Sequence, residues 1–206
     1  MTYLRLLKKQ LEETGVRVLG WCLMTNHVHW VVVPEREDSL SVLFRRVHGK
    51  YAQYLNARLI RTGHLWQNRF YSCPVAAHRE ETVLRYIEWN PVRAGMTQRP
   101  EQHVWSSAID HLNGPGSERV PLLDWTYWQA QGGAEEWRRR LEVVEDIRDV
   151  HSLRRATYSG APFGSEEFVA RIEERFGRVW RPQGRPRKGA KKEEKGPELS
   201  ASVTAA

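Results

Sequence analysis

Two apolar segments joined by a very short turn place the strongest constraint on the fold. Val16–Leu23 and residues 27–33 are rich in β-branched and other apolar side chains, and only residues 24–26 separate them. Two strands joined this closely form an antiparallel hairpin. Pro34 ends the second strand, because proline has no N–H to donate to a ladder. The chain is therefore expected to be built around an antiparallel sheet.

Segments with helical and extended patterns surround this hairpin. The expected helices are residues 2–14, a segment capped by Asp38 or Ser39 with an apolar stripe that runs to Leu55, and residues 79–89; a third strand covers residues 67–75. Gly15 ends the first helix, and Pro91 disfavours helix at Asn90. This order is most of a split β-α-β pattern. We predict an α+β, ferredoxin-like antiparallel sheet with helices on one face, from which the usual first strand is missing.

The composition changes after about residue 114. Residues 134–150 look helical and strongly charged, and Ser165 begins a short amphipathic helix. From Arg181 onward proline, glycine, lysine and glutamate dominate, which predicts disorder. The sequence thus divides into a first domain at residues 1–114, a helical extension at residues 115–180 and a disordered basic tail at residues 181–206.

Charge and cysteine content restrict the partners and the compartment. The net charge of +7 favours a polyanionic partner, nucleic acid first. Cys22 and Cys73 make neither a C-x-x-C pair nor a disulfide framework, so a reducing compartment is expected. The sequence has no apolar run of about 18 residues and no secretory signal, so we expect a cytoplasmic protein with no membrane partner.

His27 and His29 are the sharpest candidates for chemistry. Alternate residues of a strand point to one face, so both imidazoles lie on the same side, about 7 Å apart along the strand. Two imidazoles at this spacing suit a shared divalent cation. The alternative is two unrelated histidines, one packed in the core and one exposed.

Tyr86 and Asn90 form a second candidate pair. They are four residues apart at the end of a helix and share a face. A helix that ends against the sheet would bring the Asn90 amide oxygen to a metal held by the histidines, with Tyr86 one turn earlier. The alternative places Tyr86 in the core and makes Asn90 a cap or turn residue. Tyr51 is a competing tyrosine, but its place on an apolar stripe favours the core.

Basic and aromatic side chains are interleaved between the second helix and the third strand. Cations hold phosphates and aromatic rings stack on bases, so this pattern is typical of a surface that binds a nucleic-acid strand. A solvated helix face is the alternative. The residues are Arg45, Arg46, Lys50, Arg58, His64, Trp66, Gln67 and Arg69.

The tail contains one further motif for nucleic acid. Residues 184–188 (GRPRK) resemble the core of an AT-hook, an extended segment that lies in the minor groove. This predicts DNA contacts from Arg185 and Arg187, although basic tails contain such a match by chance often.

Four segments recur together, in the same order and spacing, in one known family. Residues 23–30 (LMTNHVHW) carry the histidine pair, residues 64–70 (HLWQNRF) enter the third strand, residues 86–95 (YIEWNPVRAG) carry the tyrosine, and WSS follows at 105–107. Together they resemble the single-tyrosine HUH transposases, and the REP-associated tyrosine transposases are the most similar branch.

The resemblance implies an enzyme that cuts and rejoins single-stranded, hairpin-forming DNA. In that family two histidines and a polar residue one turn after the tyrosine bind Mg²⁺ or Mn²⁺. This implies His27, His29 and Asn90 as metal ligands and Tyr86 as the nucleophile, which forms a 5′-phosphotyrosine. Arg93, in the same matched segment, is expected to contact DNA. Relatives include monomers and homodimers, so either state is expected.

Two other functions stay open at this point. A relative impaired by the loss of its first strand would bind hairpin DNA without cutting it, and its binding would survive His27→Ala. A metal-dependent RNA-processing protein would use the same basic and aromatic face and would prefer a 2′-hydroxyl.

Overall fold

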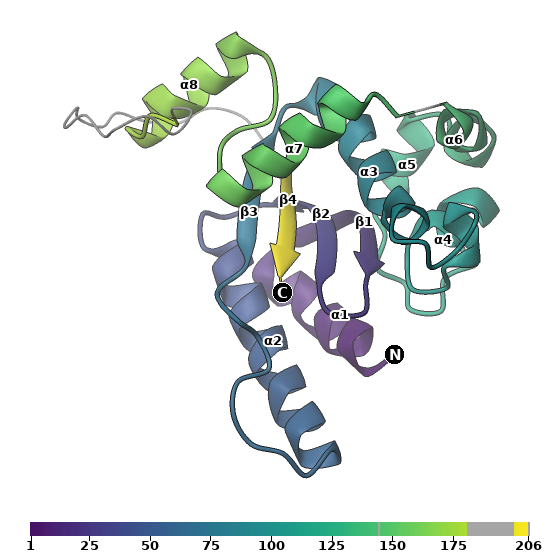
Figure 1. The fold of residues 1–206 in the computed structure, drawn as a ribbon, viewed down its shortest axis with the longest axis vertical. Coiled ribbons are helices and arrows are strands. Elements are labelled where there is room, and N and C mark those ends of the chain that lie inside the picture. The colour runs from purple at the N-terminus through teal and green to yellow at the C-terminus, as the bar shows by residue number, and fades with distance from the viewer. Residues whose placement is uncertain (144, 181–199, 206) are drawn as a thin grey trace.

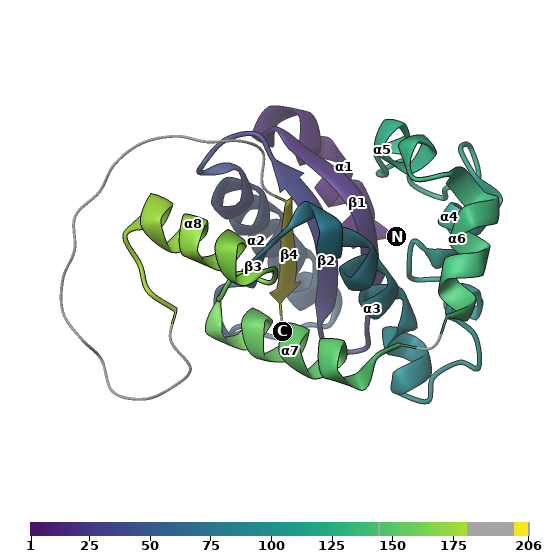
Figure 2. The same cartoon turned by 90° about the horizontal axis from the view of Figure 1, so that it is seen from above.

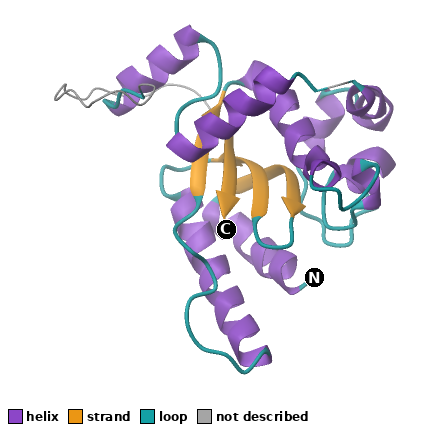
Figure 3. Cartoon of the chain, viewed as in Figure 1, coloured by secondary structure: helices purple, strands orange, loops and turns teal. Residues whose placement is uncertain are grey.

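A four-stranded antiparallel sheet forms the centre of the molecule (Figure 1). The computed structural model describes residues 1–143, 145–180 and 200–205. Its strands are β1 (Val16–Leu23), β2 (Val28–Pro34), β3 (Tyr71–Val75) and β4 (Ser200–Ala205), in the order β1-β2-β4-β3 across the sheet. Its helices are α1 (Thr2–Thr14), α2 (Ser39–Arg58), α3 (Glu80–Arg93), α4 (Ala108–Asn113), α5 (Trp125–Ala130), α6 (Gly133–Glu142), α7 (Ile147–Ser159) and α8 (Glu166–Phe176), with 3₁₀ turns η1 (Ala77–Arg79) and η2 (Pro100–Gln102) (Figure 3). The predicted α+β class is confirmed.

The predicted hairpin is present in β1 and β2. The two strands pair antiparallel, with Cys22 opposite His29 and Val16 opposite Pro34. The register shifts between Val18 and Gly20, so the side chains of β1 change face at this irregularity. Gly20 also allows close packing, because a Cβ at this position would lie 2.5 Å from the Leu84 side chain of α3. Helix α3 therefore sits directly on the hairpin.

Helices cover both faces of the sheet (Figure 2). Helices α1 and α2 pack together on one face, where Leu43 of α2 lies in one apolar cluster with Trp21 and Trp30 of the sheet, as the split β-α-β pattern predicts. Helix α3 lies on the opposite face with α7, in a second apolar cluster that includes Val31 and Ile87. The expectation of helices on one face thus holds for α1 and α2 but not for α3.

Strand β4 lies where the missing first strand was expected. It pairs antiparallel with β2 on one side, where Thr204 is opposite His29, and with β3 on the other, where Thr204 is opposite Tyr71. The predicted disorder of residues 181–206 is therefore wrong for Ser200–Ala205. Strand β4 thus supplies the backbone hydrogen-bond partners that the facing edges of β2 and β3 would otherwise lack. Residues 181–199 and 206 lie outside the described residues.

Several boundaries differ from the sequence-based expectations. Helix α3 continues through Pro91 to Arg93, because a proline costs one backbone donor but its φ suits a helix, and Pro91 is buried in the packing. Strand β3 begins only at Tyr71, since β4 offers partners to no earlier residue of this segment. The single helix expected at residues 134–150 is two helices, and Asp146 caps the second by accepting from Arg148 N–H. Among the described residues, no helix has the length and apolar character needed to cross a bilayer.

Candidate active site

The two histidines lie together at the start of β2, on the face that α3 covers. Their ring centroids are 4.7 Å apart and the rings are nearly perpendicular, so the predicted shared face is confirmed. His29 is 6% exposed, while His27 is half-buried just before the strand. The alternating pattern of the strand places both rings with Val31 and Val33, toward α3. His29 is packed and His27 is partly exposed, as the alternative of two unrelated histidines expects, but the two rings are in contact with each other.

Burial keeps both imidazoles neutral near pH 7. Desolvation lowers the pKa of His27, and it lowers the pKa of His29 to about 3, with further lowering by His27 and by the guanidinium groups of Arg93 and Arg154. His27 Nδ1 lies 2.7 Å from Asn26 Oδ1, and donation to this oxygen leaves Nε2 with a free lone pair. A neutral imidazole with one oriented lone pair is the form that binds a metal.

Tyr86 projects from α3 toward the histidine pair. Its ring centroid is 6.3 Å from that of His29, at an angle of 84°. The Arg93 guanidinium lies over the tyrosine ring, 4.3 Å from the centroid. Arg154 Nε of α7 donates to the Tyr86 hydroxyl at 3.3 Å. The phenol therefore lies between a neutral histidine and two cations, and Tyr86 as a whole is half-buried.

Asn90 follows one turn later on α3 and is 7% exposed. Its Oδ1 accepts from Arg93 at 2.7 Å, and its Nδ2 has no hydrogen-bond partner among the described residues. A carbonyl oxygen has two lone pairs, so Oδ1 has capacity for one further bond besides Arg93. In the described part of the chain, no group of three or more His, Cys, Asp or Glu side chains is placed so that it could hold a metal ion. Two neutral imidazoles and an amide oxygen are nevertheless a chemically suitable donor set for a divalent cation.

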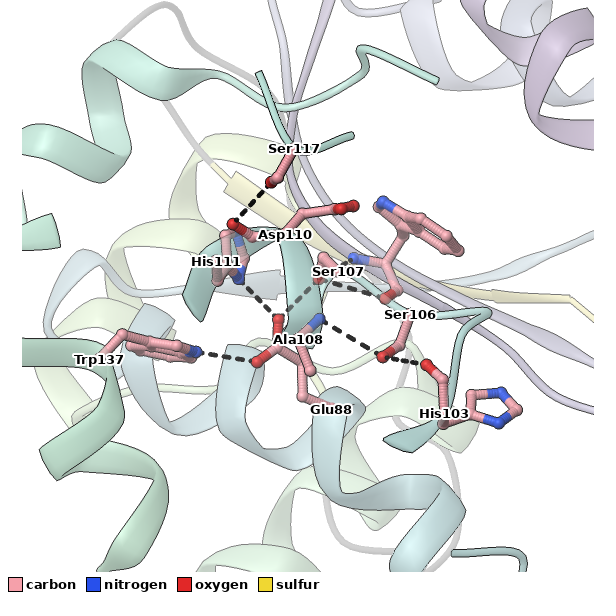
Figure 4. A network of polar contacts seen from close by, with 10 residues as sticks. Glu88, His103, Ser106, Ser107, Ala108, Asp110, His111, Ser117 and Trp137 are labelled. Carbon is pink, nitrogen blue, oxygen red and sulfur yellow. Dashed lines mark hydrogen bonds and ion pairs between the residues drawn. The ribbon is translucent and has the colours of Figure 1, made fainter. Parts of the chain in front are cut away.

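A buried polar network anchors α3 in place (Figure 4). Glu88, which is 0% exposed, accepts three hydrogen bonds through its carboxylate: from Ser107 Oγ at 2.6 Å, His111 Nδ1 at 2.6 Å and Trp137 Nε1 at 2.9 Å. Ser107 in turn accepts from the backbone N–H of Trp21 in β1. The network ties the helix that carries Tyr86 and Asn90 to β1, α4 and α6. Sequence analysis missed it, because Glu88 differs from a surface glutamate only in its partners.

We expect Glu88→Gln to destabilise the protein by about 1–3 kcal/mol. Three donors converge on the Glu88 carboxylate, whereas an amide has one acceptor oxygen, and its NH₂ group would face a donor that then has no acceptor. Urea unfolding followed by circular dichroism measures this. Glu12→Gln on the exposed side of α1 is the matched control and should change stability by less than about 0.5 kcal/mol. Equal stabilities of the two variants would show that the network contributes nothing.

The basic residues predicted on the second helix lie away from Tyr86. Arg45 and Lys50 are exposed on α2, which covers the face of the sheet opposite to α3. Arg46 is engaged within the protein, in an ion pair with Glu13 of α1 at 2.7 Å. A nucleic-acid strand that contacted both α2 and Tyr86 would have to pass around the end of the sheet where His27 lies.

The predicted aromatic platform is only partly exposed. Trp66 stacks on His48 of α2, with ring centroids 4.0 Å apart, and its Nε1 donates to the His48 carbonyl at 3.1 Å. One face of this ring is therefore used in packing. His64, Gln67 and Arg69 are exposed in the connection between α2 and β3.

Two predicted DNA contacts have other placements. Arg93 donates to the Tyr86 carbonyl and to Asn90, and pairs with Glu145. It is thus a neighbour of the tyrosine rather than an open surface cation. Arg185 and Arg187, the predicted AT-hook residues, lie outside the described residues. Arg154, which the sequence did not single out, is the unexpected member of the group around Tyr86.

Comparison with known proteins gives a family for the part of the chain that builds this arrangement. No curated protein and no solved structure is significantly similar to the chain. The model of one family, "Transposase IS200 like", matches residues 2–90, which include the histidine pair, Tyr86 and Asn90. This is a family of transposases, which act on DNA. Residues 2–90, a little less than half of the chain, are thus similar to the IS200-like transposases, which supports the resemblance to the single-tyrosine transposases.

Proposed function

We propose that the protein is a metal-dependent transposase that cuts and rejoins single-stranded, hairpin-forming DNA through a phosphotyrosine. The observation that carries this proposal is the contact series from His27 through His29 to the Tyr86 ring, within the residues that match the transposase family. The resemblance to REP-associated relatives suggests repetitive palindromic elements as the substrate. A nucleophile beside paired, neutral imidazoles is an arrangement suited to phosphoryl transfer.

An open cavity beside His27 supports a single-stranded substrate. It has a volume of about 590 Å³ and lies between the β1–β2 turn and the ends of α1 and α2. Tyr54, Trp66 and Trp105 line it together with Arg58. Aromatic faces and a cation in one recess suit unstacked bases and their phosphates, whereas a duplex keeps its bases paired and stacked.

The residues divide the chemistry between them. His27, His29 and Asn90 would hold Mg²⁺ or Mn²⁺, which when bound neutralises charge on the scissile phosphate and aligns it for in-line attack. The Tyr86 oxygen attacks phosphorus and displaces the 3′-oxygen, so a 5′-phosphotyrosine and a 3′-hydroxyl result. A second 3′-hydroxyl reseals the strand by the reverse step, and no external energy source is consumed.

Metal dependence is the test of this function. Purified protein, a labelled single-stranded hairpin and Mn²⁺ should give a protein-linked band on a denaturing gel, and EDTA should abolish it. Loss of a residue that only hydrogen-bonds to a metal ligand typically costs about 10–100-fold, and His27→Ala removes a ligand itself, so we expect a larger loss in the rate of adduct formation. The same variant should bind Mn²⁺ more weakly in calorimetry. His78→Ala, which changes an exposed histidine in η1, is the control. An adduct that forms equally in EDTA, or in His27→Ala, would refute the metal site.

The structure gives less support to the alternative functions. The impaired hairpin-binding protein was suggested by the absence of a strand beside β2, and β4 lies in that position. That alternative still predicts a retained gel shift with no covalent band. An RNA-processing activity predicts better cleavage of the RNA version of the same hairpin, so comparison of the DNA and RNA hairpins separates it from the proposed function.

A further inference from the structure

We propose that Arg154 of α7 is a catalytic residue of the Tyr86 site, where its guanidinium stabilises negative charge on the tyrosine oxygen and on the phosphate that this oxygen attacks. This inference rests on the proposed function, because it names a further group of the same site. It assigns a role to the helical extension, which lies outside the residues that match the transposase family.

The geometry points to this role directly. Arg154 Nε donates to the Tyr86 hydroxyl at 3.3 Å, so it touches the atom that would form the new bond. Helix α7 packs against both α3 and β3, so Arg154 is presented by a helix docked on the sheet (Figure 2). Arg154 is itself exposed, so the other N–H groups of its guanidinium can donate to an incoming phosphate.

The other cation beside Tyr86 is already occupied. Arg93 lies over the ring, and its donors go to Glu145, to Asn90 and to the Tyr86 carbonyl. It orients the ring but does not bind the hydroxyl. Of the two guanidinium groups, Arg154 is the one that contacts the reacting oxygen, and it comes from an element that the family model does not include.

Charged and titratable groups approach Tyr86 from three elements. His29 faces the ring from β2, Arg93 from α3 and Arg154 from α7. A cavity of about 150 Å³ between α3 and α7 is also lined by Tyr86, together with Arg85, Glu145, Asp146 and Asp149. Glu145 is paired with Arg93 and Asp149 with Arg79, so these two carboxylates are already partnered.

The proposed step keeps atoms and charge in balance. The phenol releases its proton to water, a P–O bond forms between Tyr86 and the 5′-phosphate, the P–O3′ bond breaks, and the 3′-oxygen takes a proton from water. A guanidinium stays protonated throughout, so Arg154 acts by charge-assisted hydrogen bonding rather than by proton transfer. When the tyrosine oxygen becomes an ester oxygen, the same guanidinium lies beside the non-bridging phosphate oxygens.

The test compares Arg154→Ala with Arg155→Ala, which removes the same charge from the next, also exposed, position of α7. With saturating hairpin and Mn²⁺, we expect Arg154→Ala to slow adduct formation about tenfold or more, because the charge-assisted hydrogen bond to the reacting oxygen is lost. Arg154→Lys should restore part of the rate. Hairpin affinity should stay within about twofold of wild type, and Arg155→Ala should match wild type in every readout.

A rate loss that disappears at saturating hairpin would overturn the proposal and make Arg154 a DNA-binding residue. Equal rates for Arg154→Ala and wild type would overturn it as well. A second readout needs neither DNA nor metal: urea unfolding followed by circular dichroism should give Arg154→Ala the stability of wild type, so that the loss of rate is not a folding defect. If wild type forms no adduct, the proposed function fails; if wild type forms adduct and Arg154→Ala forms it equally fast, only the inference about Arg154 fails.

Discussion

Tyr86→Phe is expected to abolish the covalent DNA adduct, with a loss of rate on the order of 10⁴-fold or more, as for removal of other enzymatic nucleophiles. The change removes one oxygen and keeps the ring. The contacts of the ring with His29 and with the Arg93 guanidinium should therefore persist, and so should the fold. The measurement is the protein-linked band formed with labelled hairpin and Mn²⁺, together with hairpin affinity by gel shift, which should change little.

Tyr51→Phe is the matched control for this prediction. Tyr51 packs on Tyr3, with ring centroids 5.1 Å apart, in the cluster between α1 and α2 on the other face of the sheet. It should form adduct at the wild-type rate. An adduct that persists in Tyr86→Phe and disappears in Tyr51→Phe would make Tyr51 the nucleophile. Tyr51 lies on the face of the sheet opposite to the His27–His29 pair, so this result would contradict our account.

Val203→Pro is expected to destabilise the protein by about 3 kcal/mol or more. Val203 lies in the middle of β4, opposite Trp30 of β2 and Ser72 of β3. A proline there removes a backbone donor from an interior strand, leaves an acceptor on a neighbouring strand unpaired and places its ring against the ladder. Because Thr204 lies opposite His29, adduct formation should fall together with stability. Urea unfolding by circular dichroism and the adduct assay measure the two effects.

Val203→Thr separates the backbone effect from the side-chain effect, because threonine keeps the N–H and favours strands. It should unfold within about 1 kcal/mol of wild type. Removal of residues 200–206 should reproduce the proline variant, since it takes away the whole ladder between β2 and β3. If the proline variant and the truncated chain both unfold like wild type, residues 200–205 do not provide the central strand.

Much of the fold follows from local patterns in the sequence. The leucines of α1, the αL glycine at Gly15 and the short turn before His27 each act over a few residues, and the structure has these elements where they were predicted. The face shared by His27 and His29 follows from the alternation of side chains along a strand. The residue pattern left open whether Tyr86 approaches this pair, because no local pattern relates residue 86 to residue 29, and the family resemblance favoured this arrangement over the core.

Features that depend on distant partners were not predictable. Strand β4 is six residues long, follows a segment rich in charge, proline and glycine, and gains its stability from strands more than 120 residues earlier in the chain. Glu88 is a buried carboxylate only because Ser107, His111 and Trp137 converge on it. Arg154 is one of several arginines on its helix, and only the packing of α7 on α3 selects it.

Peptide mapping of the trapped adduct tests the central claim most directly. Wild-type protein would be incubated with a hairpin and Mn²⁺, digested with protease and nuclease, and sequenced by tandem mass spectrometry. Our account predicts a nucleotide attached through phosphate to Tyr86, in the peptide that also carries Asn90. A nucleotide on another residue, or protein that cuts the hairpin and carries no nucleotide at all, would contradict it.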